Sequence, residues 1–183
     1  MTRTLIAGAL ATIALAAYAA DLTQFAPEKS TITFVSKQMG VPVEGKFKKF
    51  DAKIAVDPAR PENGKVQIDI DLASIDTGSK EADDEVKSKN WFHVAQFPKA
   101  SFVSQGVKSL GADKYEASGK LTIKTTTRDV RAPFTLRQDA SGALFDGAFT
   151  INRLQFKVGE GPWGDTDTVA DEVLVRFKVF AKK

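Results

Sequence analysis

Few side chains in this sequence could carry out acid–base or nucleophilic chemistry. The chain of 183 residues has no cysteine and one histidine, His93. The absence of cysteine excludes disulfide bonds, thiolate chemistry and cysteine–histidine zinc sites. Nucleophilic hydrolysis would need a base beside a serine, and the chain has neither a Gly-x-Ser-x-Gly motif nor a second histidine. His93 lies among aromatic residues, which favours a structural or rim position, so we expect a protein that is not an enzyme and uses no cofactor.

Two short motifs resemble ligand sites but have a simpler interpretation. Gly159–Gly164 matches Gly-x-Gly-x-x-Gly, yet the dinucleotide fingerprint opens a helix, and Pro162 and Trp163 place this segment in a loop. Asp165-Thr166-Asp167, followed by Asp171-Glu172, lacks the spacing and the central glycine of a calcium loop. We interpret it as a solvated acidic loop and predict no metal site.

The charge balance indicates which partners to expect. The formal net charge is +3, from 26 basic and 23 acidic residues, so nucleic acid is not an expected partner. Lys46, Lys48 and Lys49 could attract an anionic head group or a membrane surface, or could form a solvated strand face. We favour the solvated face.

The N-terminal segment has the pattern of a secretory signal. Arg3 precedes an apolar run from Leu5 to Ala17, and Ala17-Tyr18-Ala19 is a small-x-small cleavage pattern. A membrane anchor is the alternative, but the run is shorter than the ~20 residues that span a bilayer. We therefore predict a signal peptide over residues 1–19, a mature domain over 20–183, a periplasmic location and no stable membrane insertion.

The rest of the chain alternates between apolar and polar residues, as strands with one buried face do. Residues 65–72 show this best, with Val66, Ile68, Ile70 and Leu72 on one side. The stretch from Val43 to Val56 changes parity across Lys48-Lys49, which predicts a bulge or bend. Similar rows occur over residues 30–38, 100–104, 115–123, 130–136, 145–151 and 173–181.

About eight short strands joined by tight turns predict an all-β fold, an antiparallel sandwich or a closed barrel. One segment, Ser79–Asn90, has a helical pattern. Ser79 is a plausible N-cap, and Glu81, Asp83 and Asp84 occupy early turns, where the helix dipole favours acidic residues. A dense aromatic loop from Trp91 to Pro98 follows this helix.

The inward rows leave two interpretations of the interior open. Large apolar residues are interspersed with small ones, namely Gly45, Ala52, Ala117, Gly119, Ala132 and Gly147. Small residues in an eight-stranded barrel can leave room for one ligand. Alternatively, the glycines relieve crowding between strands and the phenylalanines fill the centre.

The order of several short motifs resembles the YceI-like family. These motifs are Ser30–Phe34, Val43–Phe47 with Phe50, Ile68-Asp69 with Ser74–Gly78, Trp91-Phe92 with Phe97-Pro98 and Phe102, Gly119–Ile123, and Asn152–Phe156. The resemblance covers nearly the whole mature chain. It implies an extended eight-stranded antiparallel lipocalin-like barrel, secreted to the periplasm, with an elongated apolar cavity for a polyisoprenoid or similar long-chain amphiphile.

Two functions follow as hypotheses. The first is a non-catalytic carrier of a long-chain isoprenoid or fatty amphiphile, with Gln38 or Arg153 orienting the head group. Arg153 could equally be a surface or sheet-edge charge. The second is a stress-response or protein-interaction module with a filled core, in which Trp91, Phe92 and Trp163 contact a partner. A homodimer is compatible with either. The residues predicted to bind the lipid are Phe34, Gln38, Phe47, Ile68, Ile70, Trp91, Phe92, Phe102, Leu121, Ile123, Phe134, Phe149, Arg153 and Phe177.

Overall fold

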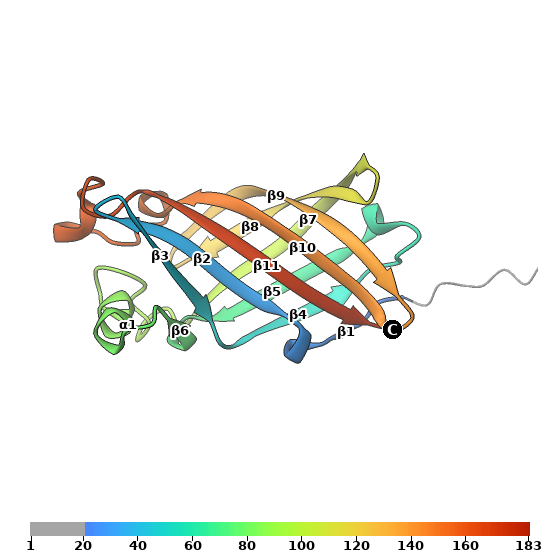
Figure 1. Cartoon of the computed structure of the whole chain (residues 1–183), viewed down its shortest axis with the longest axis horizontal. Helices are drawn as coiled ribbons and strands as arrows, with labels where there is room; N and C mark the ends of the chain where they lie inside the picture. The colour runs from blue at the N-terminus through green and yellow to red at the C-terminus, as the bar shows by residue number, and fades with distance from the viewer. Residues whose placement is uncertain (1–20) are drawn as a thin grey trace, which may run out of the picture.

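A computed structural model describes residues 21–183, so the predicted signal peptide lies outside the described part of the chain. Within this part, eleven strands form one antiparallel sheet in the order β4-β5-β7-β8-β9-β10-β11-β2-β3-β6, and β1 pairs with β11 (Figure 1). The strands are β1 (Gln24–Phe25), β2 (Thr31–Gln38), β3 (Val41–Phe47), β4 (Phe50–Ala55), β5 (Lys65–Asp71), β6 (Ile75–Asp76), β7 (Lys99–Gly111), β8 (Lys114–Ile123), β9 (Thr126–Asp139), β10 (Gly142–Asn152) and β11 (Glu172–Lys182).

The predicted all-β antiparallel fold is confirmed, with a different strand count. The stretch from Val43 to Val56 is two strands, because the chain bends out of the sheet at Lys48-Lys49, so the bend occurs and the bulge does not. β3 pairs with β2, whereas β4 pairs with β5 at the other edge of the sheet. The two-residue strands β1 and β6 account for the rest of the difference.

The sheet curls around a common interior, but its edge strands β4 and β6 do not pair with each other, and β4 does not pair with β3. Short segments bridge this opening at both ends. Leu22 exchanges two backbone hydrogen bonds with Val56, of 2.8 and 3.2 Å, just before β1 joins β11. At the other end, the Lys48 amide donates to the Ser74 carbonyl at 3.1 Å. The shell is therefore barrel-like rather than a closed cylinder of strands.

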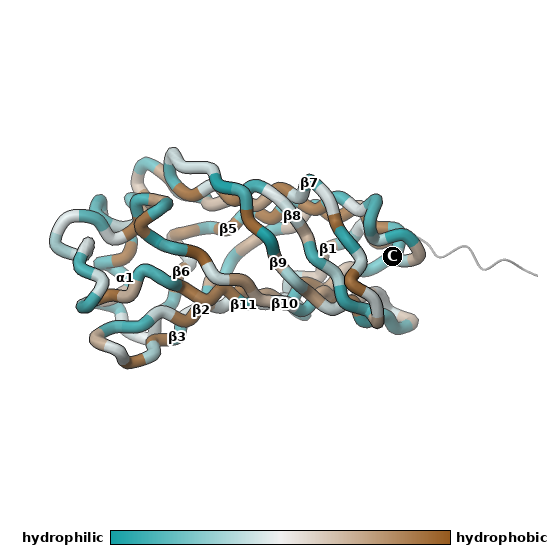
Figure 2. Tube along the Cα trace, turned by 90° about the horizontal axis from the view of Figure 1, so that it is seen from above, coloured by the Kyte–Doolittle hydropathy of each residue, from teal (hydrophilic) through white to brown (hydrophobic). Residues whose placement is uncertain are grey.

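Hydrophobic and hydrophilic residues alternate along the strands, as Figure 2 shows. Two clusters of buried side chains result. One lies near the C-terminal end of β11 and includes Phe134, Phe145 and Val179. The other includes Leu72, Leu121 and Phe156, with Trp91 and Phe92 packed against it.

The one α-helix of the described residues is α1 (Lys80–Lys87), shorter than the predicted Ser79–Asn90. Ser79 is its N-cap as predicted, because its hydroxyl accepts from the Ala82 amide at 3.5 Å. The helix ends early because the chain reverses: the amides of Trp91 and His93 both donate to the Ser88 carbonyl. Five 3₁₀ turns complete the described elements: η1 (Pro27–Lys29), η2 (Pro61–Asn63), η3 (Leu72–Ser74), η4 (Arg153–Phe156) and η5 (Gly161–Gly164).

Candidate functional site

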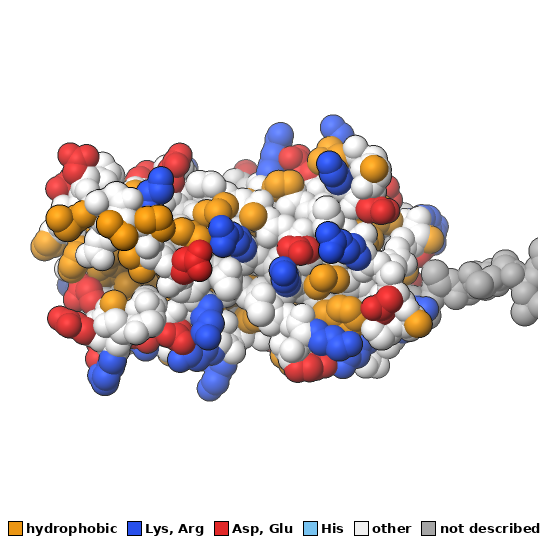
Figure 3. All heavy atoms as spheres, viewed as in Figure 1, with side chains coloured by type: hydrophobic (Ala, Val, Ile, Leu, Met, Phe, Trp, Pro, Cys, Tyr) orange, Lys and Arg blue, Asp and Glu red, His pale blue; other side chains and the backbone are white. Residues whose placement is uncertain are grey.

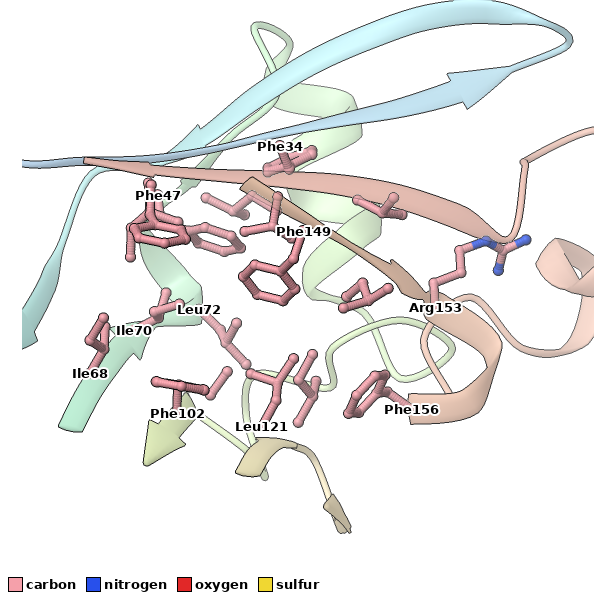
Figure 4. Close-up of a pocket in the computed structure, with 18 of the residues that line it drawn as sticks. Phe34, Phe47, Ile68, Ile70, Leu72, Phe102, Leu121, Phe149, Arg153 and Phe156 are labelled. Carbon is pink, nitrogen blue, oxygen red and sulfur yellow. The ribbon is translucent and has the colours of Figure 1, made fainter. Parts of the chain in front are cut away.

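The interior of the curled sheet contains a cavity of about 580 Å³. This volume lies in the ~300–1,000 Å³ range of small-molecule sites. Apolar side chains form most of its wall, and they come from nearly every long strand because alternate residues of each strand face inward. Figure 4 shows Phe47, Ile70, Leu121 and Phe149 arranged around one shared space. The interior is therefore not a filled core.

Every side chain predicted to bind a lipid lines this cavity: Phe34, Gln38, Phe47, Ile68, Ile70, Trp91, Phe92, Phe102, Leu121, Ile123, Phe134, Phe149, Arg153 and Phe177. Some of them also have a structural role. Phe134 is 8% exposed and stacks on Tyr115, with 5.5 Å between ring centroids. It also lies 5.8 Å from the ring of Phe145. Phe134 thus belongs both to the cavity wall and to the packed end of the core.

The two ends of the cavity differ in polarity and exposure. Gln38, Ser79 and Glu81 are lining residues that solvent reaches, and they lie at the end that α1 borders. At the opposite end, the lining residues Pro61, Val56 and Phe145 are buried. We call the first end, defined by Gln38, Thr77, Ser79, Glu81 and Glu85, the mouth.

The glycines of the inward rows relieve crowding between strands, as the second of the two interpretations of the interior expected. A Cβ atom at Gly45 would lie 2.3 Å from the Phe34 ring, and at Gly119 it would lie 2.5 Å from the Phe102 ring. A phenyl ring from a neighbouring strand thus occupies the place of each missing side chain. Ala117 and Ala132, in contrast, line the cavity and face each other across β8 and β9. These two alanines therefore present only methyl groups to the cavity, whereas Ala52 is buried in the core and the glycines accommodate rings.

Arg153 is buried, with 3% of its surface exposed, so it is neither a surface charge nor an exposed sheet-edge charge. Its five N–H groups donate to five backbone carbonyls, those of Val158, Gly159, Trp163, Val169 and Ala170, at 2.7–3.1 Å. Burial lowers the pKa of the guanidinium, and the charge of Asp171 opposes this shift.

Figure 4 shows the guanidinium of Arg153 pointing away from the apolar wall. All of its donors already have acceptors, so a head group can interact with its charge but finds no free N–H. Its position instead explains how η4 and η5 are held together beside the mouth.

Two tryptophans connect Arg153 to α1. The Trp91 ring lies 5.5 Å from the guanidinium carbon and 5.6 Å from the Trp163 ring. Trp163 donates from Nε1 to Glu85 Oε1 at 2.8 Å. Trp91 Nε1 is buried, and it is the one such side-chain nitrogen or oxygen without a hydrogen-bond partner among residues 21–183.

Sequence reasoning missed the mouth residues Thr77, Ser79, Glu81 and Glu85. A signal was present in the helix, because Glu81, Ala82, Glu85 and Val86 share one face at the i, i+3 and i, i+4 spacing. The overall polarity of the segment concealed that face. Trp163, predicted only as a partner contact, also lines the cavity.

The other chemically suggestive residues have local roles. His93 has a positive φ of 49° and packs edge-on against Phe97, with 5.8 Å between ring centroids. The exposed side chains of Lys46 and Lys48 pair with the partly buried Asp76 at 3.8 and 3.0 Å. The hydrogen bond from Lys48, followed by one from the Gly78 amide, lowers the pKa of Asp76. The carboxylate of Asp165 accepts from the Asp167 amide and the Thr168 hydroxyl, which closes the acidic loop on itself.

A curled antiparallel sheet around one apolar cavity defines a β-barrel-like binding protein. The chain belongs to the YceI-like domain family, whose model matches residues 24–181. It is 44% identical to BcnA of Burkholderia cenocepacia, whose crystal structure superposes with a TM-score of 0.84 and covers 87% of this chain and 100% of that one. A UPF0312 protein of Photorhabdus laumondii is 36% identical over 168 residues, which are 86% of this chain and 87% of that protein.

A more distant structure shows the same fold. It is a polyisoprenoid binding domain from Saccharophagus degradans, with 16% identity and a TM-score of 0.66, covering 84% of this chain and 93% of that one. The YceI-like resemblance identified from the sequence motifs is therefore confirmed, and so is the fold that it implied.

Proposed function

We propose that this protein is a non-catalytic binding protein that holds the chain of a polyisoprenoid, or of a similar long-chain amphiphile, inside the barrel. The observation that carries the proposal is the cavity of about 580 Å³, apolar along its wall and open to solvent at one end. An oily chain enters at the mouth and lies among the phenylalanine, isoleucine and valine side chains. The polar head group stays near the mouth, where the polar lining residues are found.

The energy for binding comes from transfer of the chain out of water. Each buried methylene contributes about 0.8 kcal/mol, and the wall requires no directional contact with the chain. Such a site discriminates weakly between chains of similar bulk. The proposal therefore concerns a class of ligand rather than one compound.

The comparisons with known proteins support the same class. The Saccharophagus domain that shares this fold is described as polyisoprenoid binding. The sequence contributes the second part of the proposal, the location: the predicted signal peptide, residues 1–19, would deliver the mature chain to the periplasm. A homodimer stays a prediction.

Organic extraction and native mass spectrometry of the purified mature protein test the proposal. We expect a lipid-sized adduct that disappears after extraction and reappears when the stripped protein is titrated with geranylgeraniol. Protein without an adduct, which also takes up no polyprenol, would reject the proposal and favour an interaction module. Turnover of a bound isoprenoid during the same incubation would reject the non-catalytic part.

A further inference from the structure

The mouth of the cavity contains the polar groups that a ligand head group would meet, and their charges are uneven. The charged side chains that line the cavity are Glu81, Glu85 and Arg153. Arg153 directs all five N–H groups to backbone carbonyls, as described above. No lysine lines the cavity within residues 21–183. An anionic head group would therefore meet two carboxylates and no free cationic donor.

The lysines nearest to the mouth residues in sequence are Lys37, Lys80 and Lys87, and none of their side chains lines the cavity. Lys80 pairs with Asp84 on the exposed surface of α1. The side chain of Lys124 is 8% exposed, and its Nζ donates to the Lys157 carbonyl at 2.5 Å and to Glu160 at 3.4 Å. Neither ammonium group lines the cavity.

A second and independent feature indicates that the head group carries an oxygen. Trp91 lines the cavity, and its Nε1 is buried without an acceptor. Buried N–H groups in proteins are nearly always paired. This nitrogen is itself buried, so a ligand oxygen reaches it only when the indole ring turns toward the cavity. The ring of Trp163 packs against Trp91 at a tilt and donates to Glu85, which places that carboxylate in the same part of the mouth.

These observations together describe a complementary ligand. We propose that the mouth selects an uncharged head group with a hydroxyl or amide, which accepts from Trp91 Nε1 and donates to Glu81 or Glu85, and that it disfavours carboxylate and phosphate head groups. The inference rests on the proposed function, because it assigns the head group of the same lipid. Repulsion between like charges is a common source of selectivity where both ligands fit equally well.

The test uses three lipids that share one isoprenoid chain: geranylgeraniol, geranylgeranoic acid and geranylgeranyl monophosphate. We expect the stripped mature protein to bind the alcohol at least about tenfold more tightly than the acid or the phosphate at neutral pH, because a close like-charge contact costs more than one kcal/mol. Equal affinity for the three lipids would overturn the head-group inference alone. Failure to bind any of them would instead reject the proposed function.

Isosteric variants connect the selectivity to the named residues. The double variant Glu81→Gln, Glu85→Gln keeps an oxygen acceptor for Trp163 while it removes both charges. It should bind the phosphate about tenfold more tightly than the wild type does, with little change for the alcohol. Glu62→Gln, an exposed residue of η2, is the matched control and should change neither affinity. An unchanged phosphate affinity in the double variant would contradict the role of the carboxylates.

Trp91→Phe tests the hydrogen bond separately. This variant should lower the affinity for geranylgeraniol by about two- to tenfold, which is the contribution of one hydrogen bond. It should leave uptake of the hydrocarbon squalene unchanged. Equal weakening of both ligands would show that Trp91 acts only by packing, and would remove the acceptor requirement from the inference. Thermal unfolding of each variant confirms that the fold is retained.

Discussion

Replacement of Ala117 by phenylalanine should shorten the cavity. Ala117 lies on β8 opposite Ala132 of β9, and both side chains line the cavity on the side away from α1. A phenyl ring at this position would occupy the place of about four carbons of the ligand chain. At ~0.8 kcal/mol per buried methylene, a long ligand would lose about 3 kcal/mol of binding free energy. The dissociation constant should rise more than about a hundredfold.

Polyprenols of increasing length provide the assay. Titration of stripped protein with farnesol and geranylgeraniol, followed by native mass spectrometry or calorimetry, gives affinity as a function of chain length. Ala117→Phe should lower the affinity for geranylgeraniol much more than the affinity for farnesol, because the shorter chain does not reach the new ring.

Ala148→Phe is the matched control, since Ala148 lies on β10 next to inward-facing Phe149 and does not line the cavity. This variant should bind both alcohols as the wild type does. If Ala117→Phe, properly folded by circular dichroism, binds geranylgeraniol with unchanged affinity, then the chain does not occupy this part of the interior and the reasoning is wrong.

Three further substitutions test the structure around the site. Arg153→Met should lower the free energy of unfolding by at least about 3 kcal/mol in urea titrations, because five carbonyls lose their donor; a loss below about 1 kcal/mol would contradict the role assigned to the guanidinium. Gly45→Ala should lower the free energy of unfolding by about 1–3 kcal/mol and weaken lipid binding, because the new methyl group displaces the Phe34 ring into the cavity. A variant with the melting temperature and lipid affinity of the wild type would refute this. Hydrogen bonds from the Thr77 amide, and then from its hydroxyl, hold the pKa of Asp83 below its usual 3.8. A lowered pKa stabilises the fold above the unfolded-state value and loses this effect as pH falls through the folded-state value. Asp83→Asn should therefore be less stable than the wild type at neutral pH, and the difference should shrink as pH falls through the lowered folded-state pKa of Asp83, as measured by urea midpoints.

The alternation of apolar residues predicted the inward rows correctly, because the side-chain period of a strand is two whatever its neighbours are. For example, Ile68, Ile70 and Leu72 all face the cavity as expected. In the sequence, the break between β3 and β4 at Lys48-Lys49 is visible only as a change in which alternate residues are apolar. Whether such a change is a bulge or the end of a strand depends on pairing with distant segments, here with Ser74 and with β5.

The helix boundary and the mouth show a similar limit. Ser79 was identified as the cap because capping is a local interaction. The end of α1 at Lys87 depends on the reversal that brings Trp91 under Arg153 and Gly159, which lie far along the chain. The partners of Arg153 are likewise carbonyls of loops that only the folded chain brings together.

Local chemistry and periodicity, which act over a few residues, were enough to predict an all-β chain whose strands each have one apolar face. The tertiary structure decided whether the interior is hollow, since that depends on where rings from neighbouring strands come to rest. Phe34 and Phe102 fill the spaces beside Gly45 and Gly119, whereas Ala117 and Ala132 line the cavity. The sequence contains all of these residues, but the distances between them exist only after the sheet has curled.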